Sequence, residues 1–346
     1  MKIAITADPE LPVPPLHYGG IERIIDMLVR SLIERGHDVT LIAHRESQPP
    51  CRLVPWPGRS SLSLADTIRN AATLGNEVLR GRYDLVHSFS RIAYMMPILP
   101  LPVPKLMTYQ REISRRSIQL GHRLSRGTLQ FTAISRWMMR GVEDIGAWHL
   151  VYNGVPLATY DFRPGVAPDA PLVFLGRVEE IKGPHIAIEV ARRTNLPLVI
   201  AGNVPAEYKG WFDSNIAPHL DGRSIRYVGP VNDEQKNALL GSARAFLMPI
   251  LWEEPFGIVM AEAMACGTPV IGFRRGAVPE VVTHGETGFV VDDIDQMVSA
   301  VTEVAAINRG AVRRRTEEHF SDDRICDEYL TVYRAIVRGT TRDKAA

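Results

Sequence analysis

Two glutamates, Glu254 and Glu262, stand eight residues apart in a stretch that runs from Leu251 to Glu280. The residues between them predict the start of a helix at Phe256–Val259, where backbone N–H groups have no partner inside the helix. Such groups, together with the positive end of the helix dipole, bind phosphate well, and Gly257 allows a close backbone approach. A carboxylate one or two turns further along can accept hydrogen bonds from a ribose diol. The stretch therefore predicts a site for a phosphorylated, hydroxyl-bearing ligand.

Two more clusters have the chemistry of a diphosphate site. Arg177 follows Gly176, and Lys182 precedes Gly183, just after a predicted strand. An arginine offers a planar fork of donors and a lysine offers a point charge. Tyr18, Gly19 and Gly20 open a predicted helix near the start of the chain and can place further backbone donors there. Each cluster taken singly is also typical of ordinary surface or of a turn, and only their joint order favours a common site.

Alternating strands and helices must position these residues. In the first half, a strand at 2–6, a helix at 20–35 and a strand at 38–43 form a unit that implies a parallel sheet, and short apolar runs predict strands at 85–88, 105–108, 131–134 and 151–152. In the second half we predict strands at 172–175, 198–201, 225–228, 245–249, 269–272 and 288–291, with helices at 184–194, 233–242, 258–266, 294–308 and 322–337. The fold class is therefore α/β, with two Rossmann-like doubly wound domains.

The domain boundary is predicted at a stretch rich in Pro and Gly, from Pro156 to Pro171. We assign residues 1–155 to an N-terminal Rossmann-like domain and residues 156–321 to a C-terminal one, followed by a helix at 322–340. Ligands of such sheets bind at the carboxyl ends of the strands, and two such edges that face each other form a cleft.

Composition excludes several classes of protein. The 346 residues have a net charge of +1, so no global field attracts nucleic acid. Three cysteines are too few for a disulfide framework and predict reduced thiols. The most apolar segment, Ile92–Pro104, is too short to span a membrane and contains four prolines. A cytoplasmic protein is expected, without a signal peptide.

The chain resembles glycosyltransferase family 4, whose members have the GT-B fold. The motifs that carry the resemblance extend over nearly the whole chain and are most specific between residues 172 and 292: Gly19-Gly20 with Glu22, Asn153–Val155, Gly176-Arg177 with Lys182-Gly183, Ala201-Gly202, Gly229 before Val231, Glu254–Gly257 with Glu262–Val270, and Gly285–Gly288.

This resemblance implies a retaining transfer of sugar from a nucleotide-diphosphate donor, with no cofactor and no metal ion. It also implies that the domain at 1–155 is the acceptor side, that the domain at 156–321 binds the donor, and that the helix at 322–340 packs back on the first domain. It implies that Arg177 and Lys182 bind the diphosphate and stabilise charge on the leaving group, and that Glu254 holds the donor sugar; these three are the catalytic candidates. The remaining donor-binding candidates are Gly19, Gly20, Gly202, Val231, Phe256, Gly257, Ile258, Val259 and Glu262.

Two residues are possible sugar contacts in the first half. Gln110 stands where many relatives carry a histidine, and it can bind a hydroxyl but cannot ionise near neutral pH. His87 ends a predicted strand, and for it the structural interpretation is favoured, because a single histidine there often only bonds its neighbours.

The stretch from residue 105 to residue 140 contains eight Lys or Arg residues and a single acid, Glu112. A solvated helix face and a patch for an anionic acceptor or an anionic membrane surface both fit this composition. The residues proposed for the second interpretation, which would place the protein at the inner membrane face, are Lys105, Arg111, Arg115, Arg116, Arg123 and Arg126.

Alternatives to the transferase remain open at this point. They are a catalytically inactive binder of nucleotide sugars and a non-hydrolysing sugar-nucleotide epimerase of the same fold. The block from Glu254 to Glu262 argues against the epimerase, and the presence of Arg177 and Lys182 argues against the inactive binder.

Overall fold

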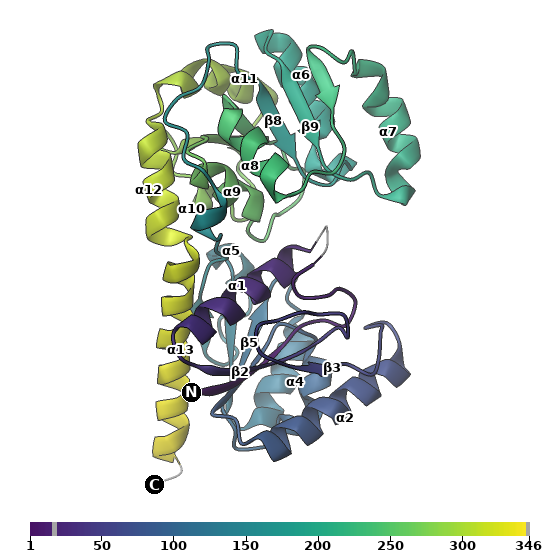
Figure 1. Cartoon of the computed structure of the whole chain (residues 1–346), viewed down its shortest axis with the longest axis vertical. Helices are drawn as coiled ribbons and strands as arrows, with labels where there is room; N and C mark the ends of the chain where they lie inside the picture. Colours follow the sequence, from purple (N-terminus) through teal and green to yellow (C-terminus); the bar gives the residue numbers. More distant parts are fainter. Residues whose placement is uncertain (16–18, 344–346) are drawn as a thin grey trace. The chain divides into compact units, whose positions relative to one another are not determined.

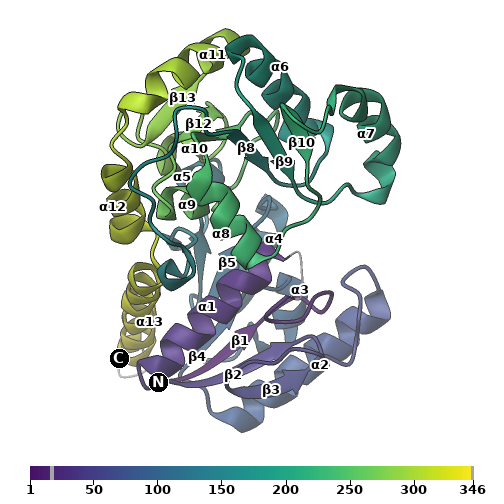
Figure 2. The ribbon, with the colours of Figure 1, turned by 45° about the horizontal axis from the view of Figure 1, so that its top comes forward.

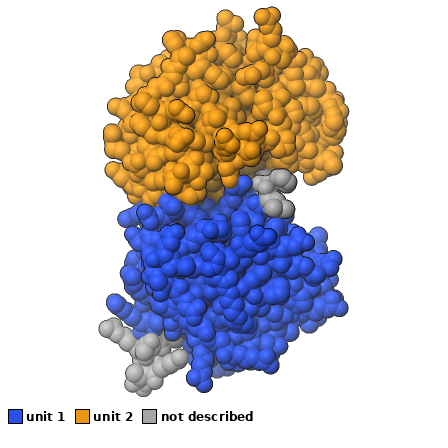
Figure 3. All heavy atoms as spheres, in the orientation of Figure 1, with its two compact units in different colours: residues 1–153, 322–346 blue, residues 154–321 orange. Residues whose placement is uncertain are grey.

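The computed structural model describes residues 1–15 and 19–343, with side chains up to residue 339, so Tyr18 lies outside the described residues. The chain forms two compact units, Met1–Asn153 with Asp322–Ala346 (unit 1) and Gly154–Ser321 (unit 2) (Figure 3). Unit 2 is thus inserted into unit 1, and its two ends are joined. The N–H of Val155 donates to the carbonyl of Phe320 at 2.8 Å, and Val155 pairs with Ser321 in a parallel bridge.

Unit 1 is built on a parallel sheet of seven strands in the order β3-β2-β1-β4-β5-β6-β7 (Figure 1). The strands are β1 (Lys2–Thr6), β2 (Asp38–Ala43), β3 (Arg52–Pro55), β4 (Leu85–Ser88), β5 (Lys105–Tyr109), β6 (Leu129–Ala133) and β7 (Trp148–Leu150). The α-helices are α1 (Gly20–Glu34), α2 (Leu64–Gly81), α3 (Ile92–Met95), α4 (Arg115–Ser125), α5 (Arg136–Met139) and α13 (Asp322–Asp343).

Strand alternation divides the core of unit 1 between the two faces of the sheet. Val86 packs in an apolar cluster with Leu74 of α2 and Tyr94 of α3. The next residue of β4, His87, turns to the other face, where its ring meets Tyr333 of α13. The C-terminal helix is therefore an integral part of unit 1, although about half of the chain separates it from the strands that it covers.

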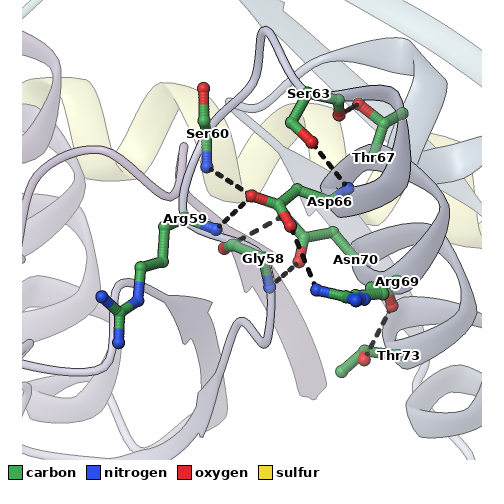
Figure 4. Close-up of polar contacts among 9 residues, drawn as sticks. All are labelled: Gly58, Arg59, Ser60, Ser63, Asp66, Thr67, Arg69, Asn70 and Thr73. Carbon is green, nitrogen blue, oxygen red and sulfur yellow. Dashed lines mark hydrogen bonds and ion pairs between the residues drawn. The ribbon is translucent and has the colours of Figure 1, made fainter.

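Helix α2 was not predicted, although its apolar residues lie on one side of the helix. Part of that side is exposed, at Leu64, Ile68 and Leu79. Its start is nevertheless well capped (Figure 4). The Ser63 hydroxyl accepts a hydrogen bond from the N–H of Asp66 at 3.2 Å, and the Asp66 carboxylate accepts from the N–H groups of Arg59 and Ser60.

Unit 2 contains a parallel sheet of six strands in the order β10-β9-β8-β11-β12-β13 (Figure 2). The strands are β8 (Leu172–Leu175), β9 (Leu198–Ala201), β10 (Ile225–Tyr227), β11 (Ala245–Met248), β12 (Val270–Phe273) and β13 (Gly288–Val291). The α-helices are α6 (Pro184–Thr194), α7 (Lys209–Asn215), α8 (Asp233–Ser242), α9 (Ile258–Ala265), α10 (Val278–Val281), α11 (Ile294–Glu303) and α12 (Arg309–His319).

The two parallel sheets with their helices confirm the predicted α/β class with two doubly wound halves. The differences lie at short or polar elements. The strand expected at residues 151–152 lies instead at β7, three residues earlier, and β3, α4 and α12 were not predicted. The helix expected at 294–308 ends at Glu303 and continues as a 3₁₀ turn at Val304–Ala306.

Candidate functional site

Most candidate residues of unit 2 lie in loops at the carboxyl edge of its sheet, and Ile258, Val259 and Glu262 lie in helix α9, which follows one of these loops. Gly176, Gly202 and Gly229 follow the neighbouring strands β8, β9 and β10. The N–H of Gly202 donates to the carbonyl of Gly229 at 2.8 Å, and the N–H of Gly176 donates to that of Ala201 at 3.1 Å. Gly202 has φ +134°, and a Cβ there would lie 1.8 Å from the carbonyl oxygen of Gly176. Only glycine fits, so the first two loops approach each other at their backbones.

Lys182, Glu254 and Trp252 form a compact group that we call the Lys182 cluster. The ammonium of Lys182 lies 2.6 Å from Oε2 of Glu254, and the indole N–H of Trp252 donates to the same oxygen at 2.9 Å. The ammonium also lies 4.5 Å from the centre of the Trp252 ring, within range of a cation–π contact. Sequence reasoning paired the lysine with a phosphate and missed the tryptophan.

The Lys182 cluster is held by contacts between loops. The N–H of Leu251 donates to the carbonyl of Ile181 at 2.8 Å, which links the loop after β8 to the loop after β11. On the other side, the N–H of Ala277 donates to the carbonyl of Glu254 at 2.9 Å. Backbone hydrogen bonds thus fix both Ile181, which precedes Lys182, and Glu254 itself.

Helix α9 begins directly after the Lys182 cluster. Gly257 is its N-cap and has φ +77°, a conformation that favours glycine. Ile258 and Val259 form the first turn, where N–H groups lack partners inside the helix. Phe256 contributes only through its backbone, because its side chain is 1% exposed and packs on the ring of Phe320, with 5.6 Å between the ring centres.

Arg177 is the second cation at this edge. Its guanidinium lies 2.8 Å from Oε1 of the buried carboxylate of Glu179, but the alignment is too poor for a hydrogen bond. Nε of Arg177 is buried and receives no partner in the described part of the chain. The Arg177 side chain is nevertheless 35% exposed, so the outer part of its guanidinium can donate to a ligand. Glu179, which sequence reasoning did not single out, holds it by charge.

Glu262 lies one turn into α9 and is 5% exposed. Its Oε1 accepts a hydrogen bond from the Tyr160 hydroxyl at 2.7 Å and another from the Lys236 ammonium at 2.5 Å. That ammonium lies 5.5 Å from the centre of the Tyr160 ring. We call these three residues the Lys236 cluster. Neither Tyr160 nor Lys236 was predicted, because Tyr160 precedes β8 and Lys236 belongs to the surface pattern of α8.

The candidates of unit 1 lie in a different setting. Gly19 is the N-cap of α1, and Gly20 is its first residue. Glu22, in the first turn, is buried, and burial raises its pKa. Asp8 follows β1, and burial, together with the charge of Glu10, raises its pKa to about 6. These carboxyl groups lie near Gly19 and Gly20, which were expected to bind phosphate, and burial favours their neutral forms.

His87 is corrected to a structural residue. It is 0% exposed, and its Nδ1 and Nε2 lie 2.6 Å from the hydroxyl oxygens of Tyr333 and Thr108. Burial lowers its pKa to about 3. Gln110 forms two 2.8 Å hydrogen bonds with the Asn153 amide, one in each direction, so a sugar hydroxyl would have to compete with that pair.

The basic stretch divides into buried and exposed members. Lys105 is 0% exposed, and its ammonium donates to the carbonyls of Leu101 and Val103, so it is not part of a surface patch. Arg115 is paired with Asp144 at 2.6 Å. Four arginines of the predicted patch remain exposed without a described ion pair: Arg111, Arg116, Arg123 and Arg126.

Metal-binding residues do not gather in the described ranges, which hold no group of three or more His, Cys, Asp or Glu side chains suited to an ion. One Asp-x-Asp triplet, Asp293–Asp295, serves other purposes. Asp293 caps α11 by accepting from the N–H of Gln296 at 2.8 Å, and Asp295 pairs with Arg193 at 2.7 Å.

Two family models match the chain in succession. Residues 18–159 match the model described as Glycosyltransferase Family 4, and residues 162–318 match the model described as Glycosyl transferases group 1. The boundary between the matches falls next to the boundary between the units.

Similar proteins extend over almost the whole chain. Spore coat protein SA of Bacillus subtilis is 24% identical over 96% of this chain and 99% of its own length. Glycogen synthase of Mycobacterium tuberculosis is 27% identical over 94% of this chain and 93% of its own. The crystal structure of Anabaena HepE in complex with UDP and glucose has a TM-score of 0.74 at 17% identity, over 96% and 99% of the two chains.

Proposed function

The chain belongs to glycosyltransferase family 4 and is a glycosyltransferase of the GT-B fold that uses a nucleotide-sugar donor; we propose that it retains the anomeric configuration and needs no metal ion. We further propose that its catalytic groups are Lys182, Arg177 and Glu254, at the carboxyl edge of the sheet of unit 2. These residues form the donor site of the proposal.

One observation carries the proposal: the ammonium of Lys182 lies beside Glu254, and α9 begins four residues after that glutamate. A diphosphate placed there meets the ammonium, the guanidinium of Arg177 and the N–H groups at the start of α9. All three favour negative charge. HepE, which shares the fold, was solved with UDP and glucose, and this supports a nucleotide sugar as the ligand.

The proposed reaction needs charge stabilisation rather than a metal. The bond between the anomeric carbon and the β-phosphate oxygen breaks, the acceptor oxygen forms its bond on the same face, and the proton of the acceptor hydroxyl passes to the departing phosphate oxygen. Negative charge grows on the diphosphate as the bond breaks. Lys182 and Arg177 stabilise that charge, which is usually the largest single contribution to catalysis.

Glu254 has two roles in this proposal. Without donor it neutralises Lys182. When the diphosphate attracts the ammonium, Oε2 of Glu254 is released and accepts hydrogen bonds from the hydroxyls of the donor sugar. Trp252 still donates to the carboxylate and keeps it in place.

The acceptor side is a separate proposal, which rests on α4. Arg116 and Arg123 are exposed on this helix, and Leu120, between them, is 49% exposed. A basic helix face with an exposed apolar side chain suits an anionic surface. We propose that α4 binds anionic lipid or an anionic acceptor at such a surface. No helix in the described residues is long and apolar enough to cross a membrane.

Liposome flotation tests the α4 proposal. Binding to vesicles with anionic lipid is expected at low salt and should weaken at high salt and in Arg116→Glu/Arg123→Glu. The exposed Arg80 of α2 provides a matched control as Arg80→Glu. Absence of binding at low salt would exclude the membrane interpretation.

A thermal-shift panel tests the donor site. UDP, GDP, ADP and TDP sugars are added in the presence of EDTA. A ligand that binds only the folded state raises the melting temperature, so a shift with one nucleotide identifies the base. The shift should disappear in Lys182→Ala. If no nucleotide shifts the wild type, the proposed site is wrong and the inactive-binder interpretation is wrong with it.

A further inference from the structure

We propose that Tyr160 and Lys236 are positioning residues that orient the carboxylate of Glu262, and that this arrangement selects ribonucleoside over 2′-deoxyribonucleoside diphosphates as donors. The inference rests on the donor site proposed above. It defines the class of donor more narrowly, because nucleotide sugars built on TDP lack the 2′-hydroxyl of the ribose.

The first step concerns the two oxygens of Glu262. Oε1 accepts from Tyr160 and from Lys236, while Oε2 receives no hydrogen bond in the described part of the chain. An ionised carboxylate has no donor of its own, so Oε2 can be satisfied only by O–H or N–H groups that come from outside. A ribose offers two adjacent hydroxyl donors, and a 2′-deoxyribose offers one.

The second step concerns how firmly the carboxylate is held. Lys236 is also drawn to Asp233, whose Oδ1 lies 3.3 Å from the ammonium. Helix α8, which contains Lys236, lies beside α9 (Figure 2), and a capping box at Asn232 and Gln235 fixes its start. Two independent elements therefore fix Oε1, and the direction of Oε2 follows from the planarity of the carboxylate.

The third step concerns Tyr160. It ends a 3₁₀ turn before β8, and its backbone is tied to α9 by a single guanidinium. Nη1 of Arg313 donates to the carbonyl of Tyr160 at 2.9 Å and to that of Ala265 at 2.6 Å. The tyrosine hydroxyl is thus held in register with the helix that carries Glu262. The contact between Arg313 and these two carbonyls therefore fixes the position of Tyr160 relative to α9.

The fourth step is the size of the selection. A hydrogen bond to a charged group changes affinity by about 10- to 100-fold. Loss of the 2′-hydroxyl removes one such bond when Glu262 is correctly oriented. When Glu262 is not oriented, the bond is weak in the ribonucleotide too, and the preference disappears.

Calorimetric titration of the whole protein tests the inference. The probes are UDP, GDP and ADP and their 2′-deoxy counterparts. We expect the wild type to bind the ribonucleotide of its preferred base about 10- to 100-fold more tightly than the deoxynucleotide. In Tyr160→Phe and in Lys236→Met, affinity for the ribonucleotide should fall about 10-fold and by more than affinity for the deoxynucleotide, which has only its 3′-hydroxyl to offer to Glu262, so that the preference for the ribonucleotide becomes smaller than in the wild type.

Two variants serve as a second test and as a control. Tyr160→Phe removes only a hydroxyl and keeps the ring, so it remains informative if Lys236→Met does not fold. Lys209→Met is the matched control, because Lys209 is also a lysine of unit 2 paired with an acid, Asp213, and placed over an aromatic ring, but it is exposed on α7. It should leave both affinities unchanged.

The outcomes separate the inference from the proposed function. If the wild type binds a ribonucleotide but shows no preference over the deoxy form, or if the variants keep the preference, Tyr160 and Lys236 do not position a ribose ligand and the inference is wrong. In either case the donor site stands. If the wild type binds none of the diphosphates, the donor site is wrong and the inference is lost with it.

Discussion

The Lys182 cluster and the Lys236 cluster contain the same three kinds of residue but differ in burial and in attachment. In each, a lysine and an aromatic donor share one oxygen of a glutamate, and the ammonium lies near the aromatic ring. The Lys182 and Glu254 side chains are 16% and 12% exposed, whereas those of Lys236 and Glu262 are 11% and 7% exposed. Lys236 also has a second acidic neighbour, Asp233.

This difference teaches how one motif can serve two purposes. In a more exposed pair the ammonium can exchange its carboxylate for a phosphate, because water and ligand reach it. In a buried pair with an additional partner, exchange leaves a charge uncompensated at high cost. We therefore interpret Lys182 as the group that changes partner during turnover and Lys236 as a fixed support.

The largest effect is expected from the exchangeable lysine. Lys182→Ala should lower kcat at least 100-fold, about 2.7 kcal/mol of barrier, since the leaving diphosphate loses its point charge. Steady-state kinetics with the nucleotide sugar found in the thermal panel provide the measurement. Lys209→Ala, in the same unit, is the control and should retain full activity. Equal activity in Lys182→Ala and Lys209→Ala would show that Lys182 does not bind the leaving diphosphate.

Glu254→Ala should have an effect of similar size but a different cause. It leaves Lys182 in place to bind phosphate and removes the acceptor for the sugar hydroxyls. We expect a loss of about 100-fold in turnover with an unchanged fold, checked by kinetics and by circular dichroism. A variant that retains turnover would show that the carboxylate only neutralises the lysine.

Stability should rank the two clusters in the opposite order. Lys236→Met leaves Glu262 buried without its cation and should cost about 3 kcal/mol of unfolding free energy. Lys182→Met should cost less, about 1 to 2 kcal/mol, because the Lys182–Glu254 pair is somewhat more exposed and, among the described ion pairs, Lys182 has no second acidic partner such as Asp233 is for Lys236. Urea unfolding of both variants measures the difference. Equal losses would contradict the distinction between a fixed and an exchangeable pair.

The smallest effect is expected from the aromatic donor of the Lys182 cluster. Trp252→Phe keeps a ring near the ammonium but removes the hydrogen bond to Glu254, so kcat/KM should fall about 5- to 10-fold. The measurement is the initial rate at low donor concentration. Loss of activity as large as that of Lys182→Ala would mean that the tryptophan contacts the donor directly.

The sequence allowed Glu254 and Glu262 to be related to each other, because a proline, a glycine and a helix start lie between them in one stretch. Lys182 lies 72 residues before Glu254, and only the joint order of the clusters and the family resemblance related it to them. The partners of Glu262 could not be predicted in this way. Tyr160 and Lys236 lie 102 and 26 residues before it, and only the packing of α8 and α9 brings them together. Charge patterns on a helix do not show which lysine turns inward.

Unit 1 was harder to predict for the same reason. Arg111, Arg116 and Arg123 were placed correctly on the surface by composition, but Lys105 was grouped with them although its ammonium is buried among carbonyl oxygens. For His87, the sequence left open both a structural role and a contact with the sugar, and the contact with Tyr333 of α13 decides for the structural role. In both cases the deciding partner comes from a segment that no local pattern identifies.

The insertion of unit 2 into unit 1 has a consequence for the order of synthesis. A ribosome releases the seven strands of unit 1 first, then all of unit 2, and only then α13, whose Tyr333 completes the environment of His87. Domains fold as units while the chain grows. Unit 2, whose ends are joined at Val155 and Phe320, can therefore reach its native form on the ribosome while unit 1 still exposes the face that α13 will cover, and that face is the part of the nascent chain most in need of protection by chaperones.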